Sequence, residues 1–189
     1  MKKFILIIFT ISLLLVGCSE NSSLENQSEK EKTKTEATSN GNKQSFEDKQ
    51  QEIVNFINKD IQEIVSYETE ANQVLATVSG DNYHNDEELY EVLAIKVIPT
   101  YQKAVNKAKS LVVEVEELKP LKAKIEEATG IYYDALVLEK EGLEKKDTEL
   151  INQSNAKGQE YKKVITEYHV EMKNLAKEYN IDYEQESTK

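Results

Sequence analysis

The sequence lacks tryptophan and arginine altogether, and it has few residues that form turns or cross-links. Of its 189 residues, six are glycine, two are proline and one is cysteine. So few glycines and prolines exclude a many-stranded β-sandwich and a collagen-like repeat. A single cysteine excludes an intramolecular disulfide and a cysteine-rich zinc site.

Positive charge is also scarce. The chain has 24 lysines against 35 acidic residues, and its formal net charge is −11. Without a basic face to displace counterions from phosphates, a general nucleic-acid binder is excluded, so we expect no nucleic-acid partner. The same excess of acid opposes adhesion to anionic wall polymers or lipids by charge alone. A protein partner, or a basic peptide, fits this charge better.

The first seventeen residues, 1–17, predict a signal peptide. Lys2 and Lys3 precede an apolar run of thirteen residues, 4–16, which only Thr10 and Ser12 interrupt. As a helix these thirteen residues span about 20 Å. A membrane-spanning helix needs about 20 residues, which span about 30 Å. The run is therefore too short for a stable transmembrane helix and has the length of a signal-peptide apolar core.

The apolar run ends in Leu15, Val16, Gly17 and Cys18. These four residues resemble the bacterial lipobox, the processing site of lipoproteins. The resemblance implies that Cys18 carries a covalent diacylglycerol, that cleavage precedes it, and that the mature protein is anchored to the extracytoplasmic face of the cell membrane. Two acyl chains anchor stably where one binds only marginally. No other cofactor is expected.

Residues 18–45 predict a lipidated cysteine followed by a disordered tether. Between residues 19 and 45 only Leu24 and Ala37 are apolar, too few to offset the entropy of ordering the chain. A flexible segment of this length reaches roughly 26–31 Å. A plain spacer is the favoured interpretation, and a wall- or partner-binding segment is the alternative. The last residues, 184–189, predict a flexible tail.

Residues 46–183 predict an all-α domain, because apolar residues recur in steps of three and four. We expect four long helices in an antiparallel, up-down-up-down bundle. Ser45 and Asp48 predict a capping box at the start of the first helix, whose apolar stripe contains one acidic residue, Glu68. Because the first helix has the weakest stripe, the alternative is a three-helix arrangement with a loosely docked first helix.

Residues that favour helix ends predict the bounds of the other three helices. The second should begin at Asp86 and run to Val115 through a kink at Pro99. The third should begin at Pro120, and the fourth should begin after Asp147 as its N-cap and end at a left-handed Asn180. Folding the last two helices about Asp147 pairs these residues: Leu121 with Met172, Ile125 with Tyr168, Ala128 with Ile165, Tyr132 with Tyr161, and Leu136 with Gly158. We expect Gly158 to make room for Leu136.

The catalytic patterns that sequence can reveal are missing, so we expect no enzyme. Neither a nucleophilic triad nor a zinc-protease pair of histidines is present. His169 is expected on a solvated helix face, and Cys18 is expected to be lipidated. The weak candidates for a metal site are Asp81, His84 and Asp86 in the polar loop 81–88. The favoured alternative is a helix connection in which Asp86 is an N-cap.

Ten tyrosines form the remaining unusual feature. Four fall on apolar seams and predict core packing: Tyr132, Tyr161, Tyr168 and Tyr179. Three are freer and could form a binding face: Tyr83, Tyr133 and Tyr183. Glu139 and Ser154 place polar groups on the inward seam, where a local hydrogen bond is expected rather than acid–base catalysis.

Together these features predict a non-enzymatic binding or scaffolding module at the cell envelope. The layout of lipobox, polar tether and antiparallel helices resembles the small helical lipoproteins of Gram-positive bacteria that are described as cell-wall-binding. That resemblance is one of architecture and carries no binding residue across. The alternatives are an immunity, exclusion or accessory lipoprotein for a secreted or membrane protein, and a metal-binding receptor that uses the 81–88 loop.

Overall fold

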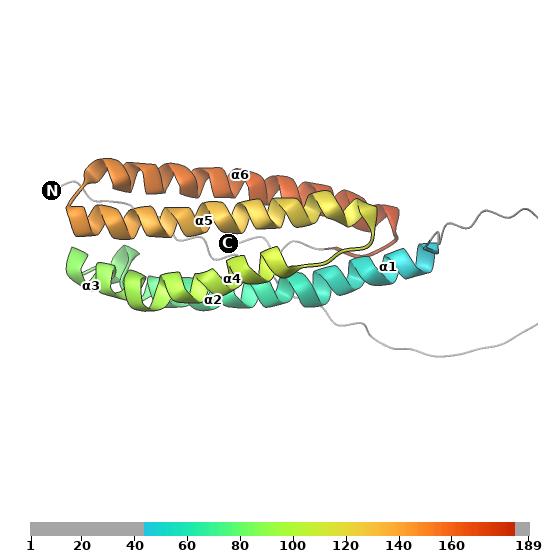
Figure 1. Ribbon diagram of the computed structural model, residues 1–189, viewed down its shortest axis with the longest axis horizontal. Coiled ribbons are helices and arrows are strands. Elements are labelled where there is room, and N and C mark those ends of the chain that lie inside the picture. Colours follow the sequence, from blue (N-terminus) through green and yellow to red (C-terminus); the bar gives the residue numbers. More distant parts are fainter. Residues whose placement is uncertain (1–43, 184–189) are drawn as a thin grey trace, which may run out of the picture.

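The computed structural model describes residues 44–183, and in that range it contains helices and connections but no strand (Figure 1). The predicted all-α fold is therefore confirmed. The predicted signal peptide, the lipobox, nearly all of the tether and the tail lie outside the described residues.

The first helical run is continuous but changes its winding once. It consists of α1 (Phe46–Asn55), a π-helical turn η1 (Phe56–Ile61) and α2 (Gln62–Ala76). The predicted capping box is present: Ser45 Oγ accepts from the backbone N–H of Asp48 at 3.1 Å, and the Asp48 carboxylate accepts from the Ser45 N–H. A connection that contains the 3₁₀ turn η2 (Gly80–Asn82) follows α2.

The second run also contains a π-helical turn. It comprises α3 (Asp86–Val92), η3 (Leu93–Val97) and α4 (Ile98–Ser110). The prediction that the helix continues through Pro99 is confirmed. Proline has no N–H to donate and crowds the preceding turn, and the wider π turn lies directly before it.

The second run ends at Ser110, so the prediction that it continues to Val115 was wrong. The chain is extended at Leu111, with φ −60° and ψ 136°. The Glu52 carboxylate accepts hydrogen bonds from the backbone N–H groups of Glu114 and Val115 at 2.7 and 2.9 Å, so these groups need no helical partner. Leu111 and Val115 are still buried, which explains why the apolar spacing continued past the end of the helix.

The last two helices are long and uninterrupted. A 3₁₀ turn η4 (Glu116–Leu118) leads into α5 (Lys119–Lys145), and α6 (Thr148–Glu178) follows after a short turn. Asp147 is the N-cap of α6, as predicted. Asn180 has a φ of 52°, and the next residue's N–H bonds to Ala176 O at 2.8 Å, which confirms the predicted left-handed cap.

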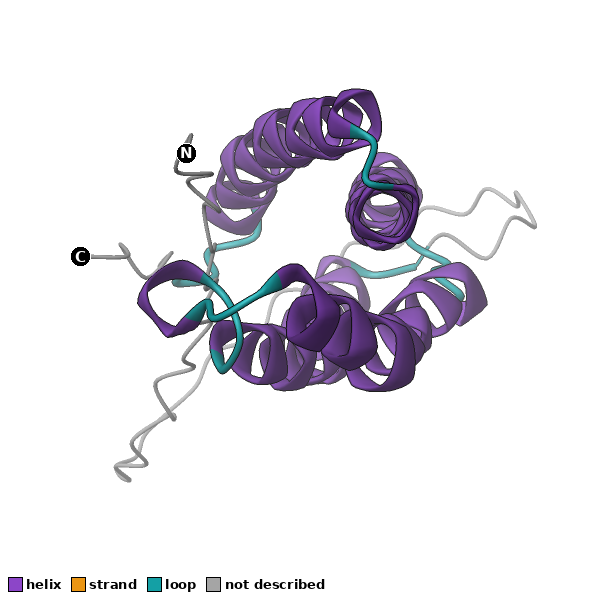
Figure 2. Ribbon diagram, turned by 90° about the vertical axis from the view of Figure 1, so that its left-hand side faces the viewer, coloured by secondary structure: helices purple, strands orange, loops and turns teal. Residues whose placement is uncertain are grey.

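Side-chain pairs fix neighbouring helices as antiparallel. Lys107 of α4 bonds Glu63 of α2 at 2.7 Å, and farther along the same pair Tyr101 meets Glu68. Between α5 and α6 the rings of Tyr132 and Tyr161 lie 5.0 Å apart, as the predicted register requires. The bundle is seen end-on in Figure 2.

The first helix is fully part of the core, so the three-helix alternative is wrong. Ile53 and Phe56 are 0% and 1% exposed. Phe46 stacks on Tyr179 at the end of α6, with ring centroids 5.0 Å apart. The start of α1 and the end of α6 therefore lie at one end of the bundle, which we call the proximal end. The distal end carries the 77–85 connection and the turn after α5 (Figure 1).

The apolar core is divided along the bundle axis. A proximal cluster includes Phe56 and Met172, and a distal cluster includes Leu75 and Leu93. On the first helical run the proximal cluster ends at Val65 and the distal one begins at Ala71, on either side of Glu68. A polar layer therefore crosses the core near its middle.

Glycines in α5 and α6 differ in what surrounds them. A Cβ at Gly158 would meet no atom within 4 Å, so the prediction that Gly158 makes room for Leu136 was wrong. A Cβ at Gly142 would lie 2.6 Å from Ile151 Cδ1 and 3.1 Å from the Ile151 backbone nitrogen. The close approach of α5 and α6 therefore occurs at Gly142, beside their turn.

The two glycines predict opposite effects of the same substitution. Gly158→Ala should raise the free energy of unfolding by about 0.5–1 kcal/mol, because alanine loses less backbone entropy in a helix. Gly142→Ala should lower it by about 1 kcal/mol, since overpacking against Ile151 outweighs that gain. Urea denaturation measures both, and a Gly142→Ala variant as stable as Gly158→Ala would contradict the close approach.

Candidate functional site

The metal candidates predicted from the sequence lie on the exposed distal connection. His84 Nδ1 is 3.4 Å from Glu88 Oε2, and the Tyr83 hydroxyl donates to Asp86 Oδ1 at 2.5 Å. Asp81 lies in η2 and is exposed. Within residues 44–183 no three acidic, histidine or cysteine side chains are grouped closely enough to hold a metal ion.

The N-cap expected at Asp86 is one residue earlier. The Asn85 side chain accepts from the backbone N–H of Glu88 at 2.9 Å, and Asp86 is the first residue of α3. An amide oxygen caps as well as a carboxylate does, so sequence alone does not separate the two positions. The loop thus serves as a helix connection with acids beside the positive end of the α3 dipole.

Several polar side chains are buried together inside the bundle, in a group that we call the central layer. Its members come from all four helical runs: Glu68 and Asn72 from α2, Tyr101 from α4, Tyr132 from α5 and Tyr161 from α6. The Tyr101 hydroxyl donates to Glu68 Oε1 at 2.5 Å, and the Tyr132 hydroxyl donates to Asn72 Oδ1 at 2.9 Å.

Ring contacts, tilted by 60° and 38°, connect these hydrogen bonds. The ring of Tyr132 lies 4.9 Å from that of Tyr101 and 5.0 Å from that of Tyr161. Tyr161 also hydrogen-bonds to the Glu68 carboxyl. The central layer thus satisfies its polar groups internally, as buried networks must to be stable.

Burial changes the acid–base behaviour of the central layer. It raises the pKa of Glu68 to about 7, although the Tyr101 and Tyr161 hydroxyls act in the opposite direction. Burial and the neighbouring Glu68 carboxyl raise the pKa of Tyr101 well above its ordinary value. These tyrosines therefore remain neutral donors at physiological pH.

Glu139 is a second buried acid, one helical turn from the backbone oxygen that Ser154 contacts. The Ser154 hydroxyl donates to Ala135 O at 2.8 Å, so a hydrogen bond is present on this seam as expected, and it is made to the backbone of α5. Burial raises the pKa of Glu139 to about 7. Its charge also acts on Tyr132, which relates it to the central layer.

His169 is 4% exposed, so the prediction that it lies on a solvated face was wrong. Its Nδ1 is 2.7 Å from the Tyr183 hydroxyl, and its ring meets Tyr168 edge-on at 5.2 Å. Burial lowers the pKa of His169 to about 4 and raises that of Tyr183 to about 12. Tyr183, predicted to be free for binding, instead covers His169 from the chain that follows α6.

A small cavity of about 20 Å³ lies between the central layer and His169. Its walls are mostly isoleucine and valine side chains of α2, α5 and α6, and its polar lining comes from Glu68, Thr129, Tyr168 and His169. Such a volume accommodates one water molecule rather than an organic ligand.

Ion pairs and hydrogen bonds close the proximal end. Glu117 Oε1 accepts from Lys49 Nζ at 2.6 Å and from the Tyr179 hydroxyl at 2.9 Å. Gln50 donates to the backbone oxygen of Tyr179 at 2.6 Å. The hydrogen bond from the Lys49 ammonium holds the pKa of Glu117 below its ordinary value. The start of α1 is thereby fixed to both η4 and the end of α6.

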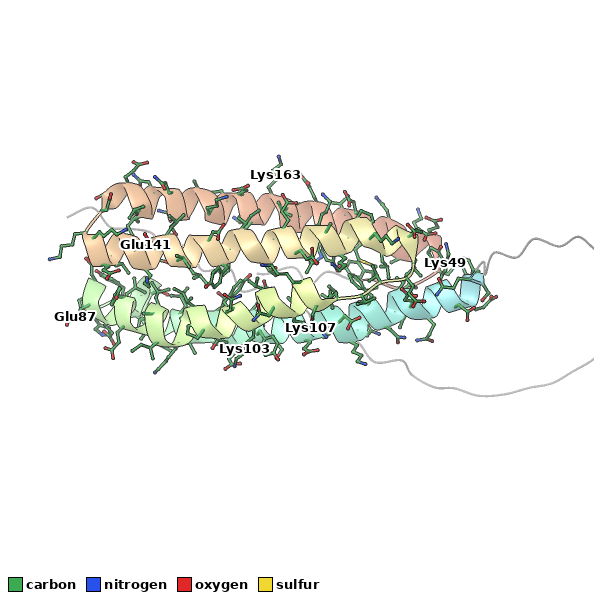
Figure 3. The ribbon with its side chains drawn as sticks, in the orientation of Figure 1. Lys49, Glu87, Lys103, Lys107, Glu141 and Lys163 are labelled. Carbon is green, nitrogen blue, oxygen red and sulfur yellow. The ribbon has the colours of Figure 1, made fainter. Side chains whose placement is uncertain are left out.

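Charged side chains cover the outside of the bundle (Figure 3). Lys163 points away from α6, and Lys103 and Lys107 lie along α4 (Figure 3). Residues 77–91 at the distal end contain five acids and no lysine. Of the predicted freer tyrosines, Tyr83 is 45% exposed here, whereas Tyr133 packs against the distal apolar cluster.

Cys18 and the lipobox residues Leu15, Val16 and Gly17 lie outside the described residues. Within residues 44–183 none of the helices combines the length and the apolar character needed to cross a membrane. Comparison with known proteins finds no matching family model, no matching curated protein and no matching solved structure.

Part of the central layer is recognisable in the sequence. Glu68 interrupted an apolar stripe, and Tyr132 and Tyr161 fell on facing seams. Tyr101 falls on the apolar stripe of the second predicted helix, and nothing local indicates that its hydroxyl meets Glu68, which is 33 residues away. A lone acid on an apolar stripe is the signal that a donor must face it from another helix.

The Tyr101–Glu68 hydrogen bond predicts the cost of removing one hydroxyl. Tyr101→Phe should lower the free energy of unfolding by about 1–3 kcal/mol, because it leaves a buried carboxyl oxygen without its donor. Tyr83→Phe is the matched control: it removes a hydroxyl that bonds an aspartate at the surface, and its effect should stay within about 0.5 kcal/mol. Equal effects of the two variants in thermal denaturation would contradict a stabilising central layer.

Proposed function

We propose that this chain is a lipid-anchored bacterial lipoprotein that serves as a non-enzymatic binding or scaffolding module on the extracytoplasmic face of the cell membrane. The observation that carries the proposal is the only cysteine of the sequence, Cys18, placed directly after a short apolar run and the residues of a lipobox.

The geometry of the bundle supports display of its distal end. The chain enters the bundle at residue 44, at the proximal end, and α6 alone spans about 45 Å at ~1.5 Å per residue. The connection at 77–85 and the turn at 146–147 therefore lie one bundle length from the point where the chain enters. An anchor before residue 44 leaves this end accessible to a partner.

Charge favours a cationic partner protein at the distal end. Residues 77–91 carry five acids without a lysine, and residues 140–149 carry four acids and three lysines. A cationic surface that docks here gains attraction and a faster encounter, and both effects weaken with salt. Anionic wall polymers and lipids are repelled by the same residues.

The lipid anchor predicts the behaviour of one substitution. Cys18→Ala removes the sulfur that would carry the diacylglycerol, so the protein should leave the membrane fraction or accumulate as an uncut precursor. Cell fractionation with mass analysis of the N-terminus measures both outcomes. A variant that is processed and retained like the wild type would contradict the anchor, whatever the bundle binds.

The distal docking surface predicts a difference between two double charge reversals. Glu87→Lys/Glu88→Lys should reduce partner cross-linking in intact cells by tenfold or more, because it reverses the field at the distal end. Glu47→Lys/Glu178→Lys is the matched control at the proximal end, where both acids are also exposed.

Circular dichroism of both double variants should show folded bundles. Glu47, Glu87 and Glu88 lie in the first turns of their helices, where each reversal costs less than about 1 kcal/mol, and a lysine at Glu178, the last residue of α6, interacts favourably with the helix dipole. Cross-linking that survives the distal reversal and disappears with the proximal one would contradict distal docking while leaving the anchor intact.

A further inference from the structure

Glu68 is a buried acid whose partners are neutral. It is 7% exposed, and within residues 44–183 the groups found to hydrogen-bond its carboxyl are the Tyr101 and Tyr161 hydroxyls. A carboxylate buried without a cation pays a large desolvation cost, which hydroxyl donors only partly offset. The geometry therefore favours the protonated carboxyl.

The titratable groups around Glu68 come from every neighbouring helix. Tyr101 of α4 and Tyr161 of α6 contact it, and the Tyr132 ring of α5 lies between their rings and interacts with Glu68 electrostatically. Glu139 acts on the same Tyr132, so a second acid of like sign is coupled to the layer. His169 faces Glu68 across the cavity.

The cavity makes ionisation possible without unfolding. Its volume of about 20 Å³ holds one water beside the carboxyl, with Thr129 and His169 as further polar lining. The π-helical turn η1 ends at Ile61, which also lines the cavity. A widened turn of this kind frequently marks a place where a helix can adjust.

We propose that Glu68 is a proton-binding site that links the packing of the bundle core to the pH outside the cell. With the proton bound, the carboxyl joins α2 to α4 and α6 through neutral hydrogen bonds. Without it, a negative charge and the cavity water occupy the centre of the core, and α2 is held less firmly. The proton site rests on the central layer alone, whereas its exposure to the pH outside the cell rests on the proposed extracytoplasmic location.

The sign of the pH dependence follows from the two states of Glu68. Its pKa is about 7 in the folded protein and near 4.5 when the chain is unfolded. The stabilisation is complete below pH 4.5, declines as the pH rises to about 7 and is constant above that. His169, whose pKa burial lowers to about 4, acts in the opposite direction between pH 4 and 6.5. Glu139, whose pKa burial also raises to about 7, acts in the same direction as Glu68. The wild type alone therefore mixes the effects of three groups.

Comparison with Glu68→Gln isolates the carboxyl, because glutamine keeps the shape and still accepts the tyrosine hydrogen bond. Thermal and urea denaturation of the full-length lipidated protein in detergent, between pH 4.5 and 7.5, give the unfolding constants. Over that range the unfolding constant of the wild type, relative to Glu68→Gln, should rise about 100-fold. Glu70→Gln, an exposed acid on the same helix, should follow the wild type. A constant ratio between Glu68→Gln and wild type would overturn the proposal.

Carbon-13 NMR of the glutamate carboxyls tests the folded state directly. The resonance that Glu68→Gln removes should titrate in the folded protein with a midpoint near 7. A midpoint below 5 in a fully folded spectrum would overturn the proposal, even if the variant changes stability for another reason.

Discussion

Four amphipathic helices are held in one alignment by the polar layer that crosses their apolar core. Leucine, isoleucine and valine seams pack almost equally well when one helix slides by a turn along another. The Glu68 carboxyl does not tolerate such a slide, because it has hydrogen-bond donors only where the Tyr101 and Tyr161 hydroxyls reach it. A buried polar residue that specifies register at some cost in stability is a known use of such groups in helical assemblies. We interpret the central layer in this way.

Local signals predicted the helices well. The capping box at Ser45, the N-cap at Asp147 and the left-handed Asn180 depend on residues within a few positions, so sequence alone identifies them. The extended segment after Ser110 was missed because its backbone is held by Glu52, some sixty residues earlier. The apolar spacing correctly predicted that Leu111 and Val115 are buried, but it wrongly predicted that they are helical.

The candidate site was predictable only in part, for the same reason. Glu68 was recognisable as an acid on an apolar stripe, but its donors belong to distant helices. His169 was assigned to the surface because it stands beside the apolar stripe of its helix, which runs through Tyr168 and Met172, rather than on it. The chain after α6 turns back and places Tyr183 on it, and no local pattern encodes that return. Tertiary contacts decide where such residues lie.

The entry of the chain at the proximal end has a mechanical consequence. A force applied through residue 44 against resistance at the turn between α5 and α6 must pass from the first helical run into its neighbours, because that run does not contain the turn. To yield, that run must slide lengthwise past its neighbours, which breaks the Lys107–Glu63 pair, the Tyr101–Glu68 bond and the apolar contacts together rather than one after another. The bundle therefore resists such a load in shear, with many contacts bearing it at the same time.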